Sequence, residues 1–249
     1  GSYYAVVTTS LGCSDTTATY TTTLLPNPDT SIALSGSLDF CPTDSVTLTA
    51  QAGLDYLWNT GDTNQSVSVS QSGSYFATIT NSLGCSATTA TYTTNVFSAP
   101  DTLVTTSGSL NLCSGQSVTL TAAPGHTYLW NTGATNQSIT TNSSGVYYAI
   151  VTTNDGCIDT TNSNVVTVSS IPTPTINASQ LKLCSGQMAT LSTPNTYSSY
   201  VWGGDTIGTL DSITVNAGHY WLTVTNSSGC SGSDTIQIDE IVPYTTQPE

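Results

Sequence analysis

The stretch that decides the fold runs from Cys41 to Cys85 and reads CPTDSVTLTAQAGLDYLWNTGDTNQSVSVSQSGSYFATITNSLGC. It recurs with a period of 72 residues as CSGQSVTLTAAPGHTYLWNTGATNQSITTNSSGVYYAIVTTNDGC, from Cys113 to Cys157. A more divergent third copy spans residues 184–230, and the chain opens with GSYYAVVTTSLGC, which matches the end of the first copy. Self-similarity at such a period is the signature of a tandem-repeat protein.

Prolines mark the borders between the copies. Pro28, Pro100 and Pro172 stand one period apart, and Pro243 is close to the next expected place. Because proline has a fixed φ and no N–H, it suits a stiff boundary that does not join a neighbouring sheet. We therefore expect an excerpt of a longer array, divided into part of a truncated repeat at 1–24, whole repeats at 25–96, 97–168 and 169–241, and the start of a further repeat or a linker at 242–249.

Short alternating stretches predict the strands of the first whole repeat. Threonine, valine, tyrosine and isoleucine, which favour strands, dominate over strong helix formers. The expected strands are Ser45–Ala50, Tyr56–Asn59, Ser66–Ser70, Ser74–Thr80 and Ser86–Thr94. Short strands at this spacing are typical of a β-sandwich. The sequence thus predicts an all-β protein, a tandem array of small immunoglobulin-like sandwich domains that forms a rod.

Two aromatic positions are expected to build each core. A tryptophan follows an apolar residue in the middle of a predicted strand, and flanking alternation favours burial over the alternative of an exposed ligand platform. A tyrosine two residues after glycine resembles the tyrosine corner of immunoglobulin-like domains, in which the hydroxyl bonds back to the backbone. The expected core residues are Trp58, Trp130, Trp202, Tyr75, Tyr147 and Tyr220.

The charge balance excludes several classes of partner. The chain has one Lys or Arg against fifteen Asp and Glu, and its formal net charge is −14. Nucleic-acid binding and polybasic membrane anchoring both need basic residues, so we expect neither. No apolar run approaches the ~20 residues of a membrane-spanning helix, which argues against direct membrane insertion.

The sequence offers no convincing catalytic or cofactor site. His126 and His219 do not recur in the other copies, and neither a G-x-S-x-G elbow nor an EF-hand calcium loop is present. Asp29 and Asp101 occupy equivalent junction positions, so calcium at the repeat junctions is a weak alternative; Thr173 replaces them in the third copy. We expect a protein without enzymatic activity and without a cofactor.

A second aromatic follows each corner tyrosine. Adjacent strand residues face opposite sides of a sheet, so one aromatic of each pair should point outward. Exposed aromatic rows often mark contact surfaces. The candidate contact residues are Phe76, Tyr148 and Trp221. The alternative is that the junction segment of the chain itself covers them.

The repeated motifs carry a family resemblance. C-x-x-x-[SM]-[VA]-T-L, then [YV]-[LV]-W-x-x-G or a close variant, then G-x-Y-[YFW], then G-C resembles the Ig-like or PKD-like repeats of giant secreted cell-surface proteins of Bacteroidota. These include gliding-motility adhesins and other type IX-secreted proteins. The third copy departs from the pattern at Met188, Ala189 and Gly203–Gly204. The resemblance implies an extracellular location at the cell surface.

Two cysteines per copy favour disulfides in an oxidising compartment over thiol catalysis or metal ligation. We expect pairs within repeats, Cys41–Cys85, Cys113–Cys157 and Cys184–Cys230, because four strand traversals would return the chain to the same end. Cys13 would then pair upstream. The alternative depends on an extra short strand at Asp62–Gln65. That strand would put the two cysteines at opposite ends, and a bridge such as Cys41 to Cys157 would join successive repeats instead.

Aspartate is often followed by serine or threonine and then an apolar residue. This pattern arises by chance in a Ser/Thr-rich chain, but the resemblance implies an O-glycosylation motif. Ser45, at the start of an expected buried strand, is the poorest acceptor. The candidate acceptors are Thr16, Thr102, Thr160, Thr206, Ser212 and Thr235.

The leading functional prediction is a non-enzymatic extracellular repeat region that forms the stalk or filament of a large bacterial cell-surface protein and serves attachment. Its partners would be other cells, surface glycans or neighbouring copies in a filament or bundle. Two alternatives stay open. One is an array of carbohydrate-binding modules that uses exposed aromatics such as Trp221, and the other is an accessory region of a secreted enzyme.

Overall fold

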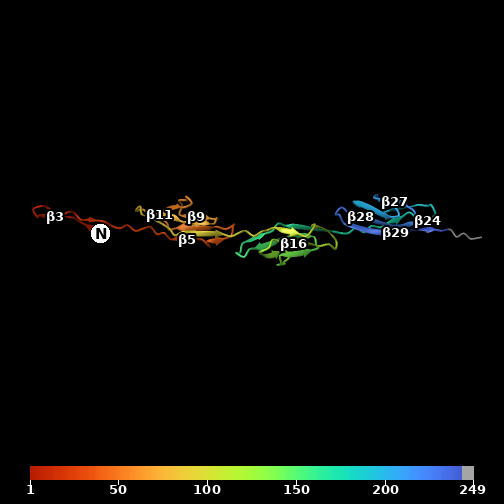
Figure 1. Ribbon diagram of the computed structural model, residues 1–249, viewed down its shortest axis with the longest axis horizontal. Coiled ribbons are helices and arrows are strands. Elements are labelled where there is room, and N and C mark those ends of the chain that lie inside the picture. The colour runs from red at the N-terminus through yellow and green to blue at the C-terminus, as the bar shows by residue number, and fades with distance from the viewer. Residues whose placement is uncertain (243–249) are drawn as a thin grey trace, which may run out of the picture. The chain divides into compact units, whose positions relative to one another are not determined.

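The computed structural model describes residues 1–242, all of whose regular elements are strands (Figure 1). The expected start of a further repeat, with Pro243, lies beyond these residues except for Val242. The chain separates into two compact units. The first contains Gly1–Ala99 together with Asp155–Cys157, and the second contains the remainder from Pro100 onward. Residues 1–242 hold no helix of the length and apolarity needed to span a membrane.

The first unit begins with four short strands and continues with the first whole repeat. The opening strands form two pairs, β1 with β4 and β2 with β3, and all of their residues are exposed. Their bounds are β1 (Ser2–Tyr3), β2 (Val6–Thr8), β3 (Ser14–Thr16) and β4 (Tyr20–Thr21). Repeat 1 contains β5 (Ile32–Leu34), β6 (Asp39–Phe40), β7 (Val46–Ala50), β8 (Asp55–Trp58), β9 (Ser66–Val69), β10 (Gly73–Tyr75), β11 (Ala77–Thr80), β12 (Ser86–Thr88) and β13 (Tyr92–Val96).

The second unit contains the other two whole repeats. Repeat 2 comprises β14 (Val104–Thr106), β15 (Asn111–Cys113), β16 (Val118–Ala122), β17 (Thr127–Trp130), β18 (Ser138–Thr141), β19 (Gly145–Tyr147), β20 (Ala149–Thr152), β21 (Ile158–Thr160) and β22 (Asn164–Ser169). Repeat 3 comprises β23 (Asn177–Ala178), β24 (Lys182–Cys184), β25 (Ala189–Ser192), β26 (Ser199–Gly204), β27 (Ser212–Val215), β28 (Gly218–Thr225) and β29 (Ser231–Ile241).

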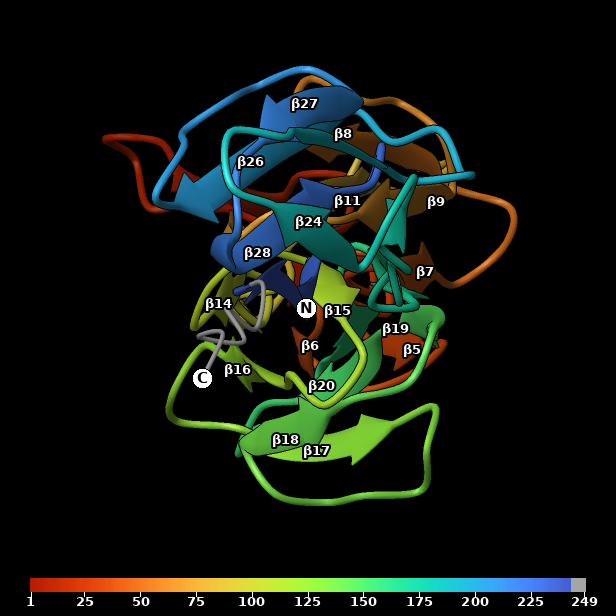
Figure 2. The same ribbon diagram turned by 90° about the vertical axis from the view of Figure 1, so that its right-hand side faces the viewer.

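Each repeat is a sandwich of two layers. In repeat 1 one layer is β5-β7-β9, and the other consists of β8-β11-β12 continued by β10-β13-β6. In repeat 3 the second layer is one sheet, β24-β29-β28-β26, in which β26 pairs along its length with β28 (Figure 2). Strands β7 and β16 bury every second residue, which is the alternation expected of a strand with one face toward a core.

The second layer is interrupted in repeats 1 and 2 by a bulge that the sequence did not reveal. The expected strand at Ser74–Thr80 divides into β10 and β11 because the Ala77 N–H donates to the Thr89 hydroxyl and the Thr89 N–H donates to the Ala77 carbonyl. Ala149 and Thr161 repeat this pattern. One extra residue on one strand of a pair defines a β-bulge. The sequence also missed the short strands β5 and β6 before Cys41.

The three predicted tryptophans lie in the cores of their sandwiches. Trp58, Trp130 and Trp202 are 1%, 1% and 0% exposed. Each indole N–H donates to a backbone carbonyl, of Asn64, Asn136 and Leu210 respectively. A buried indole keeps its hydrogen bond in this way while its ring fills the space between the sheets.

The predicted corner tyrosines also bond as expected. The hydroxyls of Tyr75, Tyr147 and Tyr220 donate to backbone carbonyls four residues earlier, at distances of 3.1, 3.0 and 3.1 Å. Burial, together with the negative charge of Asp205, raises the pKa of Tyr220. Because the protonated phenol is the donor, this shift lets the corner bond persist to more alkaline pH than an unshifted tyrosine would allow.

A matched pair of leucines in repeat 2 tests this core. Leu120→Ala should destabilise the repeat by about 2–5 kcal/mol, because Leu120 is fully buried and its removal leaves a cavity. Leu129→Ala should change stability by less than about 0.5 kcal/mol, because Leu129 is 49% exposed. Native-state hydrogen exchange of the β16 and β20 amides measures both effects, and equal losses of protection would contradict the assignment of the core.

Candidate functional site: disulfide junctions and an outer sheet face

The two cysteines of a repeat lie at opposite ends of its sandwich. In repeat 1 the parallel pair of β6 and β13 matches Phe40 with Val96, and the Phe97 N–H donates to the Phe40 carbonyl. Cys41 therefore lies where the chain leaves the repeat, and we call Cys41, Cys113 and Cys184 exit cysteines. Cys85 lies in the turn between β11 and β12. We call Cys13, Cys85, Cys157 and Cys230 turn cysteines.

The turn cysteine lies where the chain enters its repeat. In repeat 1 the turn after β11 is joined to the incoming chain, because the Asn81 amide donates to the Pro26 carbonyl at 2.9 Å. Strand β5, the first strand of the repeat, begins opposite Ala50 at this same end. Cys85 is therefore at the entrance end, whereas Cys41 is at the exit end.

A return segment between β8 and β9 produces this separation. Trp58 at the end of β8 donates its backbone N–H to the Asp62 carbonyl. Three residues after Asp62, Gln65 lies beside Ala50, the last residue of β7. Ala50 and Gln65 exchange two hydrogen bonds, N–H to carbonyl at 3.0 Å and side-chain amide to carbonyl at 2.8 Å. The chain thus crosses the repeat once more than the expected strands would allow, although residues 62–65 are not hydrogen-bonded as a strand.

The expected disulfide pairing within repeats is wrong. The bridges are Cys41–Cys157 and Cys113–Cys230, with Cα atoms 5.5 and 5.6 Å apart, a separation that suits a disulfide. Each bridge joins an exit cysteine to the turn cysteine of the next repeat, which is the alternative that the return segment implies. Cys85 and Cys184, also predicted to be bonded, carry free thiols in the described structure, as does Cys13.

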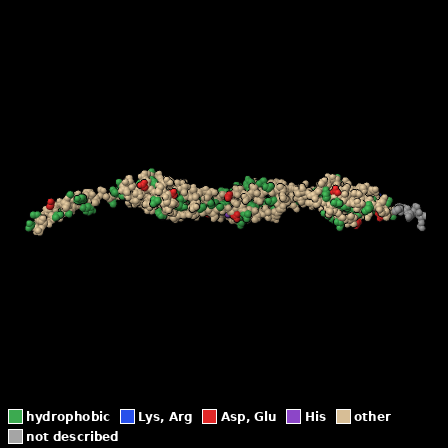
Figure 3. Space-filling model, turned by 90° about the horizontal axis from the view of Figure 1, so that it is seen from above, with side chains coloured by type: hydrophobic (Ala, Val, Ile, Leu, Met, Phe, Trp, Pro, Cys, Tyr) green, Lys and Arg blue, Asp and Glu red, His purple; other side chains and the backbone are tan. Residues whose placement is uncertain are grey.

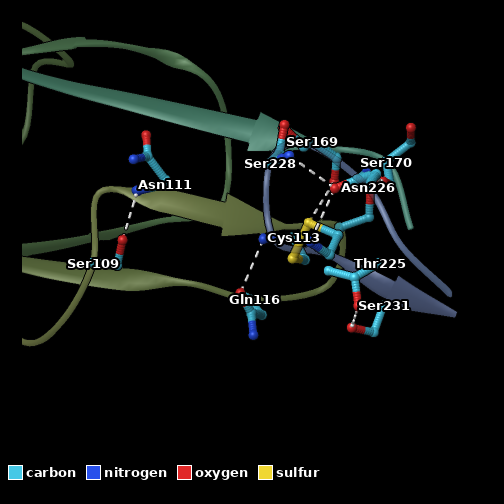
Figure 4. Close-up of a disulfide and its surroundings, with 12 residues drawn as sticks. Ser109, Asn111, Cys113, Gln116, Ser169, Ser170, Thr225, Asn226, Ser228 and Ser231 are labelled. Carbon is cyan, nitrogen blue, oxygen red and sulfur yellow. Dashed lines mark hydrogen bonds between the residues drawn. A yellow bond between two sulfur atoms is a disulfide. The ribbon is translucent and has the colours of Figure 1, made fainter. Parts of the chain in front are cut away.

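Asn226 holds the turn that carries Cys230 (Figure 4). Its side-chain oxygen accepts the N–H groups of Ser228 and Cys230, both at 3.0 Å. Its amide donates to the Ser170 carbonyl at 3.0 Å, in the segment that leads into repeat 3. One side chain therefore fixes the turn and attaches it to the incoming chain beside the bridge.

The exit side of the same bridge is equally ordered. Cys113 pairs with Ser169 in the parallel ladder of β15 and β22, and the Ser114 N–H donates to the Ser169 carbonyl. The Cys113 N–H donates to the Gln116 side chain at 2.9 Å (Figure 4). The exit cysteine is thus held in register with the last residue of β22, the last strand of its own repeat.

The bridges close very long loops. The bonded cysteines are separated by 116 and 117 residues. In the chain-entropy model each bridge of this size stabilises the folded chain by about 5 kcal/mol. For sandwiches of about 72 residues, whose cores are small, this is a large fraction of the net stability.

The candidate contact aromatics face outward. Phe76, Tyr148 and Trp221 are 37%, 37% and 39% exposed. In repeat 1, the Asn59 side chain bonds to the strand at this position: its amide donates to the Ser74 carbonyl, and its oxygen accepts the Phe76 N–H. In repeat 3, Gly203 replaces that asparagine, and a Cβ there would overlap the Trp221 ring. The departure of the third copy from the motif therefore makes room for the larger aromatic.

Repeat 2 carries an apolar outer sheet face that sequence reasoning missed. The face pairs Leu129 with Ile150 and Val146 with Val165, around Tyr148, and all five side chains are exposed. The signal was present in the sequence, since these residues are the outward partners of the buried positions. In repeat 1 the corresponding residues are mostly polar: Leu57, Ser74, Phe76, Thr78 and Thr93. Elsewhere the visible surface is mainly neutral and polar, with scattered acidic side chains (Figure 3).

The junction aspartates act as turn caps. Asp29 accepts the Ser31 N–H and Asp101 accepts the Leu103 N–H, both at 2.9 Å. The hydrogen bonds from the Ser31 backbone and side chain lower the pKa of Asp29. Among residues 1–242 no group of three or more His, Cys, Asp or Glu is arranged to hold a metal ion. Calcium at the junctions stays a prediction.

The candidate glycan acceptors differ in exposure. Thr16, Thr160 and Thr235 are exposed, and each donates its backbone N–H to the carboxylate of the preceding aspartate. Ser45 is also exposed and precedes β7, so burial does not exclude it. The remaining candidates, which are half-buried, are Thr102, Thr206 and Ser212. O-glycosylation at all of these positions stays a prediction.

Comparison with known proteins identifies the fold. No protein-family model and no curated protein matches the sequence. The crystal structure of the eight N-terminal Ig domains of Down Syndrome Cell Adhesion Molecule (DSCAM) isoform 1.30.30 matches with a TM-score of 0.54 and 14% identity, covering 97% of this chain and 40% of that one. The expected class, all-β with immunoglobulin-like sandwich domains, is confirmed.

Two further solved structures resemble the chain more distantly. Domains 3–5 of Drosophila OTK give a TM-score of 0.37 at 12% identity, covering 88% of this chain and 100% of that one. The ectodomain of mouse nectin-like molecule 4 gives 0.32 at 13% identity, covering 83% and 98%.

The role of Asn226 can be tested by Asn226→Ala. We expect the Cys113–Cys230 bridge to be reduced more readily, by about five- to thirtyfold in equilibrium constant, because the Cys230 N–H and Ser170 carbonyl lose their partner at a cost of about 1–2 kcal/mol. Titration with dithiothreitol, followed by mass spectrometry of the alkylated cysteines, measures the shift. The neighbouring exposed Ser227→Ala serves as the control and should leave the equilibrium unchanged.

Proposed function

We propose that this chain is a non-enzymatic, load-bearing and adhesive repeat region of an extracellular protein. The observation that carries the proposal is the pair of disulfides that join successive repeats in series. Disulfides persist in oxidising compartments outside the cytosol, which supports the extracellular location. The sequence resemblance further supports a stalk or filament of a large bacterial surface protein of the type IX-secreted kind.

The two disulfide loops overlap in the sequence between residues 113 and 157. Under tension, force between Cys41 and Cys230 can therefore be carried along either of two short covalent paths. One crosses the first bridge and continues through residues 157–230; the other follows residues 41–113 and crosses the second bridge. Each route contains about 72 residues of backbone, whereas the unbridged chain would release the whole segment 41–230.

Attachment would use the apolar outer face of repeat 2. Exposed apolar patches on monomeric proteins are small, and larger ones mark interaction sites. The alternative is a carbohydrate-binding role for Trp221, whose ring lies against Gly203 and is 39% exposed. We therefore assign binding of cells or surfaces to repeat 2, through Leu129, Val146 and Ile150.

Single-molecule stretching tests the load-bearing role. With both bridges intact, the segment 41–230 should extend to about 250 Å, and after reduction to about 650 Å, at ~3.5 Å per residue. The Cys113→Ser variant alone should still extend to only about 250 Å, because the Cys41–Cys157 bridge still provides a short path. Combining Cys41→Ser with Cys113→Ser should release the full length, and a long extension in the single variant would contradict the two-route arrangement.

Exchange of the outer-face residues between repeats tests the adhesive surface. Val146→Ser with Ile150→Thr should lower adsorption of the chain to a methyl-terminated surface several-fold, because two exposed apolar side chains are lost. Ser74→Val with Thr78→Ile, the reciprocal change in repeat 1, should raise it. A quartz-crystal microbalance measures both, and equal adsorption by all three proteins would refute a role for this face.

A further inference from the structure

Two of the free cysteines have the same local contacts as bonded cysteines, but each lacks its partner sulfur. The Cys113–Cys230 bridge combines an exit cysteine in register with the last strand of its repeat and a turn cysteine held by a capping side chain at the entrance end of the next repeat. Cys184 and Cys85 meet these two descriptions separately.

Cys184 has the register of a bonded exit cysteine. It pairs with Ile241 in the parallel ladder of β24 and β29, as Cys113 pairs with Ser169 in repeat 2. Its backbone N–H donates to the Gln187 side chain at 2.9 Å, the counterpart of the bond from Cys113 to Gln116. Cys184 is exposed and therefore accessible to a partner.

Open hollows lie beside Cys184 and beside the bonded Cys41. Beside Cys41, a hollow is lined on one side by Asp155, from the turn that carries Cys157. A hollow beside Cys184 in repeat 3 is lined by Leu183, Cys184, Gly186, Gln187, Asn216, Ala217 and Glu240, of which the first four correspond to residues that line the hollow beside Cys41. The exposed Cys184 therefore lies at the edge of an open depression, as the bonded Cys41 does.

Cys85 has the cap of a bonded turn cysteine. The Asn81 oxygen accepts the N–H groups of Leu83 and Cys85 at 3.1 and 3.0 Å. Its amide donates to the Pro26 carbonyl of the incoming chain at 2.9 Å. Asn226 makes the same three bonds around bonded Cys230. The turn is thus already in the bonded arrangement without a bridge.

We propose that Cys184 and Cys85 are the exit and turn halves of one further inter-repeat disulfide, and that the partner of each is the complementary cysteine of an adjoining repeat of this kind. A second copy of this chain, joined head to tail, supplies both halves: Cys184 of the leading copy bonds to Cys85 of the following one. Every junction of such an array would then carry one bridge.

The bond forms by oxidation of two thiols. The thiolate of one cysteine attacks a small oxidised disulfide, such as oxidised glutathione, and forms a mixed disulfide while one glutathione thiolate leaves. The second cysteine thiolate then displaces the remaining glutathione. The two protons lost by the cysteine thiols are taken up by the two glutathione thiolates, so that two reduced glutathione molecules carry away both electrons.

The test is a tandem protein in which residues 1–241 are followed directly by residues 25–249 of a second copy. After equilibration with reduced and oxidised glutathione, we expect three reactive thiols, and non-reducing peptide mapping should recover Cys184 of the first copy linked to Cys85 of the second. Five reactive thiols, with the Cys41–Cys157 and Cys113–Cys230 bridges intact in both copies, would overturn the proposal. The established bridges report that both copies are folded.

A shifted thiol provides the matched control. Cys184→Ser with Ser185→Cys in the first copy keeps the number of cysteines but moves the thiol one residue beyond the strand, and adjacent strand residues face opposite sides. We expect five reactive thiols in this variant. A bridge from the shifted cysteine to Cys85 would overturn the argument from register, and so would a bridge between the two Cys85 residues in the parent tandem.

Discussion

The rest of the structure depends on two hydrogen bonds that the core tryptophan donates to the return segment, one from its backbone N–H and one from its indole N–H. The Trp58 backbone N–H donates to Asp62 and its indole N–H to Asn64; Trp130 and Trp202 bond their own return segments in the same way. A single buried residue thereby fills the core and fixes an extra crossing of the sandwich. That crossing is tied to the largest fully buried side chain of each repeat, and it persists in the divergent repeat 3, where the connection is longer.

The extra crossing determines how the cysteines combine. An exit cysteine and a turn cysteine of one repeat are held at opposite ends, so the sulfur atoms that come within bonding distance belong to successive repeats. Small sandwiches commonly use disulfides to compensate for a small core. Here the same bonds also connect domains, so that local stability and continuity along the chain come from one set of residues.

The sequence predicted what depends on local patterns. The buried tryptophans and the corner tyrosines follow from alternation and from the Gly-x-Tyr motif, and the structure places Trp58 and Tyr75 accordingly. The disulfide pairing depends on the direction in which residues 62–65 run, and those residues have no strand pattern. The bulge at Thr89 was hidden for a similar reason, because a threonine in a Thr-rich strand gives no sign that its hydroxyl replaces a backbone partner.

The contacts that stabilise this protein are formed mainly by uncharged groups. With a single basic side chain in the chain, ion pairs cannot contribute much, and cross-strand hydroxyl pairs take their place. Two such pairs lie beside turn cysteines. The hydroxyl oxygens of Thr80 and Ser86 are 2.8 Å apart, and those of Thr225 and Ser231 are 2.9 Å apart. Neither such pairs nor disulfides are screened by salt or titrated near neutral pH, whereas surface ion pairs weaken as ionic strength rises. A chain held together in this way keeps its junctions in surroundings whose salt and acidity a cell does not control, which is the condition that an extracellular array has to meet.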